Sequence, residues 1–280
     1  MRIMYWNCTA PAGRDDKKPF AIDKCEFIGA RVRACNPAVL CLDEVSSSVS
    51  HQSEAQAWAD KFIANGDRNH HYECKGIIQN EGTHLNAVVF IHHEFAKLVT
   101  VSGEGLPSKD WITDKTKRNL LRAEYQDKKG TGRIAHFWFL HANASRIGGK
   151  TAVGHAAKWV ADRNNDVLIG DFNNDITHLK SDVATTPSVG NAFEAWSKEL
   201  FTQWKTSISP SLGLRIFGST YYLIPNATYD FAVSNKHQTV KLTAADSLAE
   251  LPDTHPNVNG LGFLLLSFDH FPIVYDITFP

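Results

Sequence analysis

Short apolar runs in this chain lead directly into polar residues, and this pattern restricts the folds that the chain can adopt. The clearest run is 167–169, Val-Leu-Ile, which continues into Gly170-Asp171-Phe172-Asn173. A run of this length between polar residues predicts a buried strand, with Asp171 and Asn173 at its carboxyl end. A carboxylate and an amide at this spacing can position a water molecule and a phosphate oxygen. The same residues would also suit a turn after a core strand, so this segment alone leaves both interpretations open.

The pattern recurs along the whole chain. Apolar runs at 3–6, 38–42 and 137–140 each end in polar residues, and the last strand pattern begins with them. These polar residues are Asn7, Asp43-Glu44, His141-Ala142-Asn143 and Asp269-His270. Catalytic groups often project from the ends of several strands into one shared cleft. We therefore expect a single site assembled from segments that are distant in the sequence.

The remaining periodicity predicts a strand-rich chain with helices between the strands. Helical spacing covers 22–32, 55–63, 148–161 and 193–201. Further strand patterns cover 85–91, 98–101, 120–125, 134–140, 229–233 and 273–277. We expect an α+β fold, a four-layer sandwich of two mostly antiparallel β-sheets flanked by helices. The chain has 280 residues, 43% of them hydrophobic, and no repeat or linker, which predicts one domain over 1–280.

Charge and cysteine content limit the class of protein. With 29 basic and 30 acidic residues the chain has no overall attraction for polyphosphate, so affinity for nucleic acid must come from a local cleft and its metal. The five cysteines lie in the first third without a Cys-x-x-Cys pair, and we expect them to be reduced.

The beginning of the sequence bears on where the protein works. Met1 leads at once into a strand pattern, which leaves no room for a secretion signal. The longest apolar runs are far shorter than the ~20 residues needed to cross a bilayer. We expect a protein of the cytosol, or one exported by a route that is independent of a signal, without membrane association.

The order of the polar clusters resembles the endonuclease/exonuclease/phosphatase superfamily, the DNase I-like enzymes, over nearly the full chain. The superfamily pattern is an early Asn, a strand-end Glu, a His motif, Gly-Asp-x-Asn, Tyr-Asp or Leu-Asp, and a terminal Asp-His. Within it, segments 118–122, 139–145 and 148–149 look most like the catalytic subunit of cytolethal distending toxins. The resemblance implies the same sandwich architecture and metal-dependent hydrolysis of phosphate esters.

The resemblance also implies a metal site. Glu44 would be the principal ligand of Mg²⁺, because a hard divalent ion prefers carboxylate oxygen and keeps several waters. Asn7 and Asp269 would complete or orient this site. Mn²⁺ and Ca²⁺ are alternative ions.

Two histidines would act on the phosphate. The resemblance places His141 and His270 on two sides of the scissile group, one assisting deprotonation of water and the other donating to the leaving group, in either order. Asp230 would bond His270 and fix its tautomer. Asp171 and Asn173 would position the attacking water and a phosphate oxygen.

Arg118 lies where the family has an arginine that grips a substrate phosphate, a role that suits the bidentate guanidinium. A basic stretch in a loop is equally typical of a solvated surface.

The sequence departs from the family pattern at several positions. Phe268 stands where a Ser normally precedes the terminal Asp-His. Asp43-Glu44 replaces the commoner Gln-Glu, and the added charge either alters metal preference or points away. No carboxylate pairs securely with His141, and Glu81 is the candidate. The doubled histidines at 70–71 and 92–93 are expected to be structural, since neighbours on a strand face opposite sides.

The leading hypothesis is a monomeric Mg²⁺-dependent endonuclease that cleaves DNA with low sequence specificity, a toxin or effector whose delivery partner the sequence does not identify. A phosphatase acting on phosphoinositides or nucleotides is the alternative on the same fold. Segments 181–217 and 237–262 contain no basic cluster suited to a polyphosphorylated headgroup, which favours nucleic acid. A catalytically degenerate binding module is the third hypothesis, and the near-complete polar set argues against it.

Overall fold

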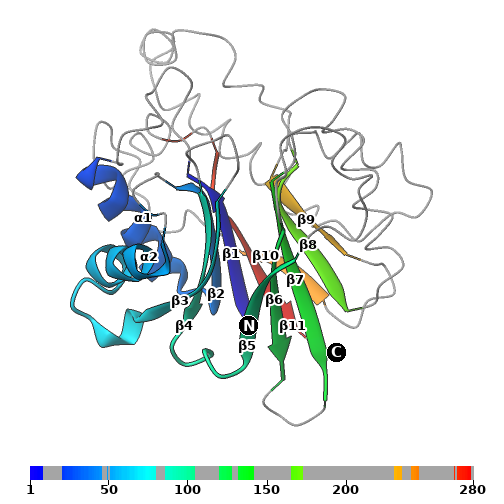
Figure 1. The fold of residues 1–280 in the computed structure, drawn as a ribbon. Helices are drawn as coiled ribbons and strands as arrows, with labels where there is room; N and C mark the ends of the chain where they lie inside the picture. The colour runs from blue at the N-terminus through cyan, green and yellow to red at the C-terminus, as the bar shows by residue number, and fades with distance from the viewer. Residues whose placement is uncertain are drawn as a thin grey trace, which may run out of the picture.

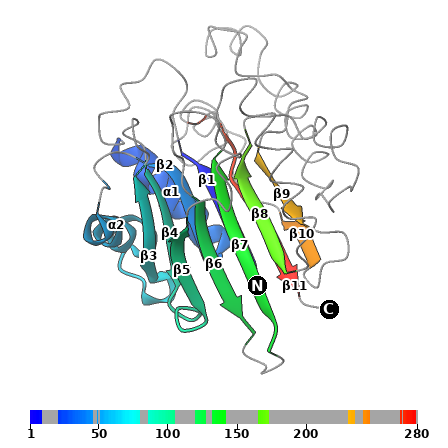
Figure 2. The same cartoon turned by 45° about the vertical axis from the view of Figure 1, so that its right-hand side comes forward.

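Two β-sheets lie face to face in the computed structural model of the chain (Figure 1). The structure describes residues 1–8, 21–45, 49, 51–79, 86–104, 120–127, 132–141, 165–172, 230–234, 241–245, 268 and 270–278. Helices α1 (Ile22–Cys35) and α2 (Gln52–Ala59) lie against the outer face of one sheet, as a second view also shows (Figure 2). The predicted sandwich of two sheets is confirmed. The helices expected at 148–161 and 193–201 lie outside the described residues.

The first sheet has six strands and carries both chain ends of the described part. In spatial order they are β10 (Lys241–Ala245), β11 (Ile273–Thr278), β1 (Arg2–Asn7), β2 (Val39–Val45), β4 (Asn86–His92) and β3 (Tyr72–Gln79). Only β1 and β2 pair in parallel, with α1 as the crossover that such pairing requires. Their register sets Asn7 beside Asp43, so the polar ends of both strands meet at one edge.

The second sheet has five strands. In spatial order they are β5 (Val99–Glu104), β6 (Leu120–Gln126), β7 (Ile134–His141), β8 (Asp166–Asp171) and β9 (Asp230–Ser234). Strands β7 and β8 are parallel, and their register sets His141 beside Asp171. Strand β9 runs antiparallel to β8, so its first residue, Asp230, pairs with the last residue of β8. This topology gathers three residues of the predicted site at one edge.

Alternation along the strands divides the core into two layers. Tyr5, Phe137 and Ile169 belong to the layer between the sheets, whereas Trp6 and Phe27 belong to the layer between the first sheet and its helices. All five side chains are at most 1% exposed. Burying an apolar side chain of this size contributes roughly 1.5–3 kcal/mol. The two layers hold the strand ends, and therefore the site, in fixed relative positions.

Helix α1 packs closely on the short π-helix η1 (Asp60–Ala64). A Cβ added at Gly29 would lie 1.9 Å from the carbonyl oxygen of Phe62, so only glycine permits this approach. The helix ends at Asn36, whose φ of 44° is the left-handed conformation common at helix ends.

The structure differs from the sequence-based expectation in its secondary structure at three places. Strands β3 and β10 were not predicted, and the helix expected over 55–63 is divided between α2 and η1. Strand β3 contains a Gly and several polar residues, and its pairing with β4 shifts register between Cys74 and Gly76, so its apolar alternation is weak. Strand β10 is a short edge strand.

Two findings within the described residues bear on the expectations from composition. All five cysteines are buried, and none of them forms a disulfide. No helix in the described part of the chain has the length and apolar character to cross a membrane.

Candidate active site

The candidate active site lies at one end of the sandwich, where both sheets present polar strand ends. Strand β2 contributes Asp43 and Glu44, β7 contributes His141, and β8 contributes Asp171. Asp43 and Asp171 are 2% and 1% exposed, so both carboxylates are held inside the protein. Buried carboxylates require compensating partners, because an isolated buried charge is strongly disfavoured.

Asp171 is the centre of this group. Its Oδ2 accepts a hydrogen bond from Asn7 Nδ2 at 3.1 Å, which links β8 of the second sheet to β1 of the first. Strand β8 can lie close enough to β7 only because residue 170 is glycine: a Cβ there would lie 1.8 Å from Leu140 O. The position of Asp171 therefore depends directly on its glycine neighbour.

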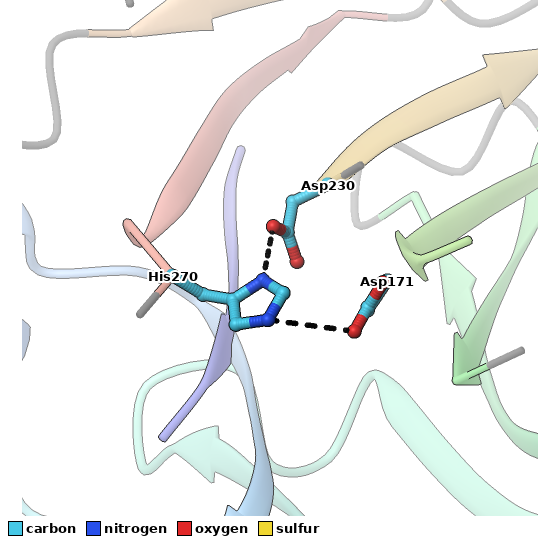
Figure 3. A group of neighbouring side chains, drawn as sticks. All are labelled: Asp171, Asp230 and His270. Carbon is cyan, nitrogen blue, oxygen red and sulfur yellow. Dashed lines mark hydrogen bonds and ion pairs between the residues drawn. The ribbon is translucent and has the colours of Figure 1, made fainter. Parts of the chain in front are cut away.

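His270 and Asp230 form a hydrogen-bonded pair beside Asp171 (Figure 3). Nδ1 of His270 is 2.6 Å from Asp230 Oδ2, and its Nε2 is 3.7 Å from Asp171 Oδ2. Burial raises the pKa of Asp230 to about 6, although the neighbouring imidazole opposes this effect. The predicted contact between Asp230 and His270 is thus present in the structure.

The main chain of His270 is also held, since Trp6 Nε1 donates to His270 O at 3.1 Å. Trp6 in turn contacts Phe268 in a tilted ring arrangement, with ring centroids 4.6 Å apart. Phe268, which replaces the Ser of the family pattern, is 2% exposed and packs in the core layer under the helices.

His141 stands on the other side of Asp171. Its Nδ1 is 2.9 Å from Asp43 Oδ2 and 3.5 Å from Glu44 Oε1, and its Nε2 is 3.6 Å from Asp171 Oδ2. The Asp43 contact is an ion pair at short distance rather than an aligned hydrogen bond.

The pair shifts both pKa values toward the charged forms. Burial by itself would lower the pKa of His141, but Asp43, Asp171 and Glu44 outweigh it and raise that pKa above its usual value. Burial would raise the pKa of Asp43, yet His141, Tyr5 and the Glu44 amide together lower it. Each group therefore stabilises the charge of the other.

Glu44 reaches this side of the sheet because of a β-bulge. The pairing of β2 with β4 shifts between Leu42 and Val45, and Glu44 adopts a φ of 52°. In a regular strand Asp43 and Glu44 would face opposite sides. A left-handed conformation is uncommon for Glu and is typical of strained functional positions. The bulge allows both carboxylates to approach His141.

Asp171, Asp230 and His270 could hold a metal ion, because their ligand atoms all lie within 4.8 Å of one another. Carboxylate oxygens fit a hard divalent cation. The predicted ligand Glu44 lies beside His141, and Asn7 donates its amide to Asp171; their roles as metal ligands stay predictions. The remaining predicted site residues, Asn173, Asp269 and Arg118, lie outside the described residues.

Sequence reasoning did not identify Asp43 as the partner of His141. Glu81, the candidate for that place, lies outside the described residues. A usable signal was present: Asp43 follows Val39 and Cys41 on the inner face of β2, where Tyr5 of the neighbouring strand can reach it. The sequence pattern identifies Tyr5 only as an apolar strand residue.

Comparison with known proteins supports this architecture. No protein-family profile and no curated protein sequence matches the chain. Among solved structures, the human Nocturnin catalytic domain matches with a TM-score of 0.58 and 16% identity, covering 100% of this chain and 94% of that one. An endonuclease/exonuclease/phosphatase from Beutenbergia cavernae matches with a TM-score of 0.52 and 19% identity, covering 99% and 71%. The chain has the DNase I-like fold.

A third similar structure is ANGEL2, described as a 2′,3′-cyclic phosphatase, with a TM-score of 0.51 and 12% identity over 99% of this chain and 94% of that one. Identities this low demonstrate a common fold and leave the activity to be argued from the site.

Proposed function

We propose that the chain is a metal-dependent phosphodiesterase, specifically an Mg²⁺-dependent endonuclease that cleaves DNA with little sequence preference. The observation that carries this proposal is the approach of two imidazoles to one buried carboxylate. Nε2 of His141 and Nε2 of His270 lie 3.6 and 3.7 Å from Asp171 Oδ2. His141 ends a strand of the second sheet, whereas His270 precedes a strand of the first. A phosphodiester between them would meet a proton acceptor and a proton donor from two walls.

This arrangement meets the needs of phosphodiester hydrolysis. One imidazole can take a proton from the attacking water while the other supplies one to the departing oxygen, and such positioned acid–base groups contribute ~10²–10⁴ in rate. Asp171 would orient the water. A bound divalent ion would neutralise charge developing on the phosphate. Its ligands would come from Glu44, with Asn7 and Asp269, so that both imidazoles remain available for proton transfer.

Substrate class is inferred from charge and motif. The near-neutral chain lacks a basic cluster in 181–217 and 237–262 for a polyphosphorylated headgroup, which favours a nucleic-acid backbone. The segment 139–145, which resembles the cytolethal distending toxin subunit, supports a toxin or effector that acts on DNA as a monomer.

A nucleotide phosphatase is the second candidate. The similarity to ANGEL2, a 2′,3′-cyclic phosphatase, favours a small nucleotide ester over a phosphoinositide within this class. The same histidine pair would serve either substrate.

The test is nicking of supercoiled plasmid by the purified protein in Mg²⁺, Mn²⁺ or Ca²⁺, with EDTA as the metal-free control. We expect His270→Ala and Asp171→Asn to lower the nicking rate by ~10²–10⁴. His93→Ala is the matched control, because His93 is exposed and lies outside the site. Nicking that survives EDTA or either site substitution would refute the proposal.

The same samples should be given adenosine 2′,3′-cyclic phosphate and a phosphoinositide. An intact plasmid with metal-dependent hydrolysis of either compound would move the chain to the phosphatase class. No turnover of any substrate by folded protein would favour a binding module.

A further inference from the structure

Asp43 is held more rigidly than a solvated strand-end carboxylate would be. Its Oδ2 accepts a hydrogen bond from Tyr5 Oη at 2.8 Å, and its Oδ1 accepts one from the Glu44 amide at 2.8 Å. The Asp43 side chain is only 2% exposed, and Tyr5 is 1% exposed. A buried carboxylate with both oxygens occupied by donors has little freedom to rotate.

The remaining contact of Asp43 is with His141. Asp43 Oδ2 is 2.9 Å from Nδ1, closer than Glu44 Oε1 at 3.5 Å. Glu44 is also the more exposed of the two carboxylates, at 14% against 2%. Asp43 is therefore the principal neighbour of Nδ1, and the other ring nitrogen faces Asp171.

The second histidine also has a buried carboxylate at Nδ1, and there the contact is a hydrogen bond. Asp230 Oδ2 is 2.6 Å from Nδ1 of His270, and Nε2 of that ring faces Asp171. The group bonded to one ring nitrogen determines which nitrogen carries the proton. Two buried carboxylates, on strands β2 and β9, thus stand behind two imidazoles that converge on one residue.

We propose that Asp43 is the positioning residue of His141: it keeps the proton on Nδ1 and directs Nε2 toward the substrate phosphate, while Tyr5 fixes Asp43. This inference rests on the proposed function and deepens it, since it states how the first histidine is prepared for proton transfer. In the family pattern a Gln commonly stands at the position of Asp43. In this chain Asp43 supplies the carboxylate partner of His141, for which the sequence offers no other secure candidate.

The experiment compares Asp43→Asn with the wild type by two independent readouts. The first is the tautomer of His141, measured from ring ¹⁵N shifts in metal-free, histidine-labelled protein at about pH 9, well above the ordinary histidine pKa of about 6.5. A His141→Gln variant assigns the signals among the 13 histidines. We expect a predominant Nδ1–H form in the wild type and a shift toward Nε2–H in Asp43→Asn. An unchanged tautomer in the variant would overturn the proposal.

The second readout is steady-state hydrolysis. In serine proteases, replacing the aspartate bonded to the catalytic histidine by asparagine lowers kcat by about 10⁴. We expect Asp43→Asn to lower kcat by ~10²–10⁴ with KM within about threefold, and Tyr5→Phe to lower kcat less. A loss confined to KM would contradict a positioning role.

Asp166→Asn is the matched control for both readouts. Asp166 is also a buried carboxylate paired with a histidine, at 2.9 Å from His136 Nδ1, but it begins β8 whereas Asp171 ends it. This variant should leave kcat and the His141 signals unchanged. If the wild type hydrolyses no phosphate ester, the proposed function fails, while the tautomer measurement still decides whether Asp43 positions His141.

Discussion

Substituting Gly170 by Ala should damage both the stability and the activity of the protein, because this glycine lets β8 approach β7. A new Cβ would lie 1.8 Å from Leu140 O, and atoms of this kind do not approach within 3.0 Å. The strands must therefore separate locally by more than about 1 Å. Since the obstacle is main chain, rotation of a side chain cannot relieve it.

Overpacking usually costs about 1–3 kcal/mol, and we expect Gly170→Ala to reach or exceed the upper value. In a chain of this size, that corresponds to a fall in Tm of roughly 6–12 °C. Asp171 follows directly, and a displacement of ~1 Å at a reacting group can cost about 10²-fold in rate. The measurements are thermal unfolding by circular dichroism and plasmid nicking at a temperature where both proteins are folded.

Gly76→Ala is the matched control. It is also a strand glycine, but an added Cβ would meet Val101 Cγ1 at 2.7 Å, a side-chain atom that needs to move only a little. We expect a Tm loss of a few degrees at most and an unchanged nicking rate. If Gly170→Ala retains the wild-type Tm and rate, the close approach of β7 and β8 does not position Asp171, and this reasoning is refuted.

Two further predictions concern the ion pair of His141 with Asp43 and the contact of α1 with η1. Because the pKa of His141 is raised in the folded state, its ion pair with Asp43 stabilises the protein below the ordinary histidine pKa of about 6.5, and this stabilisation is lost as pH rises through the folded value. The stability lost in Asp43→Asn, measured by urea unfolding in EDTA, should therefore be larger at pH 6 than at pH 9; an equal loss would contradict it. Gly29→Ala should lower Tm because its Cβ would lie 1.9 Å from a carbonyl oxygen of η1, and it should leave kcat unchanged at temperatures where it is folded, as differential scanning calorimetry and nicking can check.

The gathering of several candidate site residues could be predicted because each of them ends or begins an apolar run. His141 and Asp171 come directly after apolar runs whose length and composition predict buried strands, and they are the last residues of β7 and β8. Their parallel pairing then places them in register. The contact between Asp230 and His270 was predicted from the family resemblance rather than from pattern, and the structure contains it.

The partner of His141 could not be predicted, for two physical reasons. Asp43 belongs to the first sheet and His141 to the second, so their contact depends on how the sheets pack, which periodicity does not report. The position of Glu44 depends on a bulge with a φ of 52°, and no turn residue marks it in the sequence. Strand β3 was missed because its own residues do not alternate clearly, and its pairing with β4 stabilises it.

The charge of the described site gives a reason why this end of the sandwich suits a divalent cation. Asp43, Glu44, Asp171 and Asp230 bring four carboxylates together, and His141 and His270 can supply at most two positive charges. Burial, with Asp171 nearby, raises the pKa of Asp230 to about 6, in keeping with this crowding of carboxylates. The remaining net charge of at least −2 would be balanced by one divalent cation, and hard cations prefer carboxylate oxygen. A negatively charged phosphodiester would bind beside these carboxylates only after such neutralisation, because like charges in a buried site repel. If the proposed function is right, the histidines would transfer the protons, and the excess of carboxylates would make a divalent ion necessary for substrate binding as well as for the chemical step.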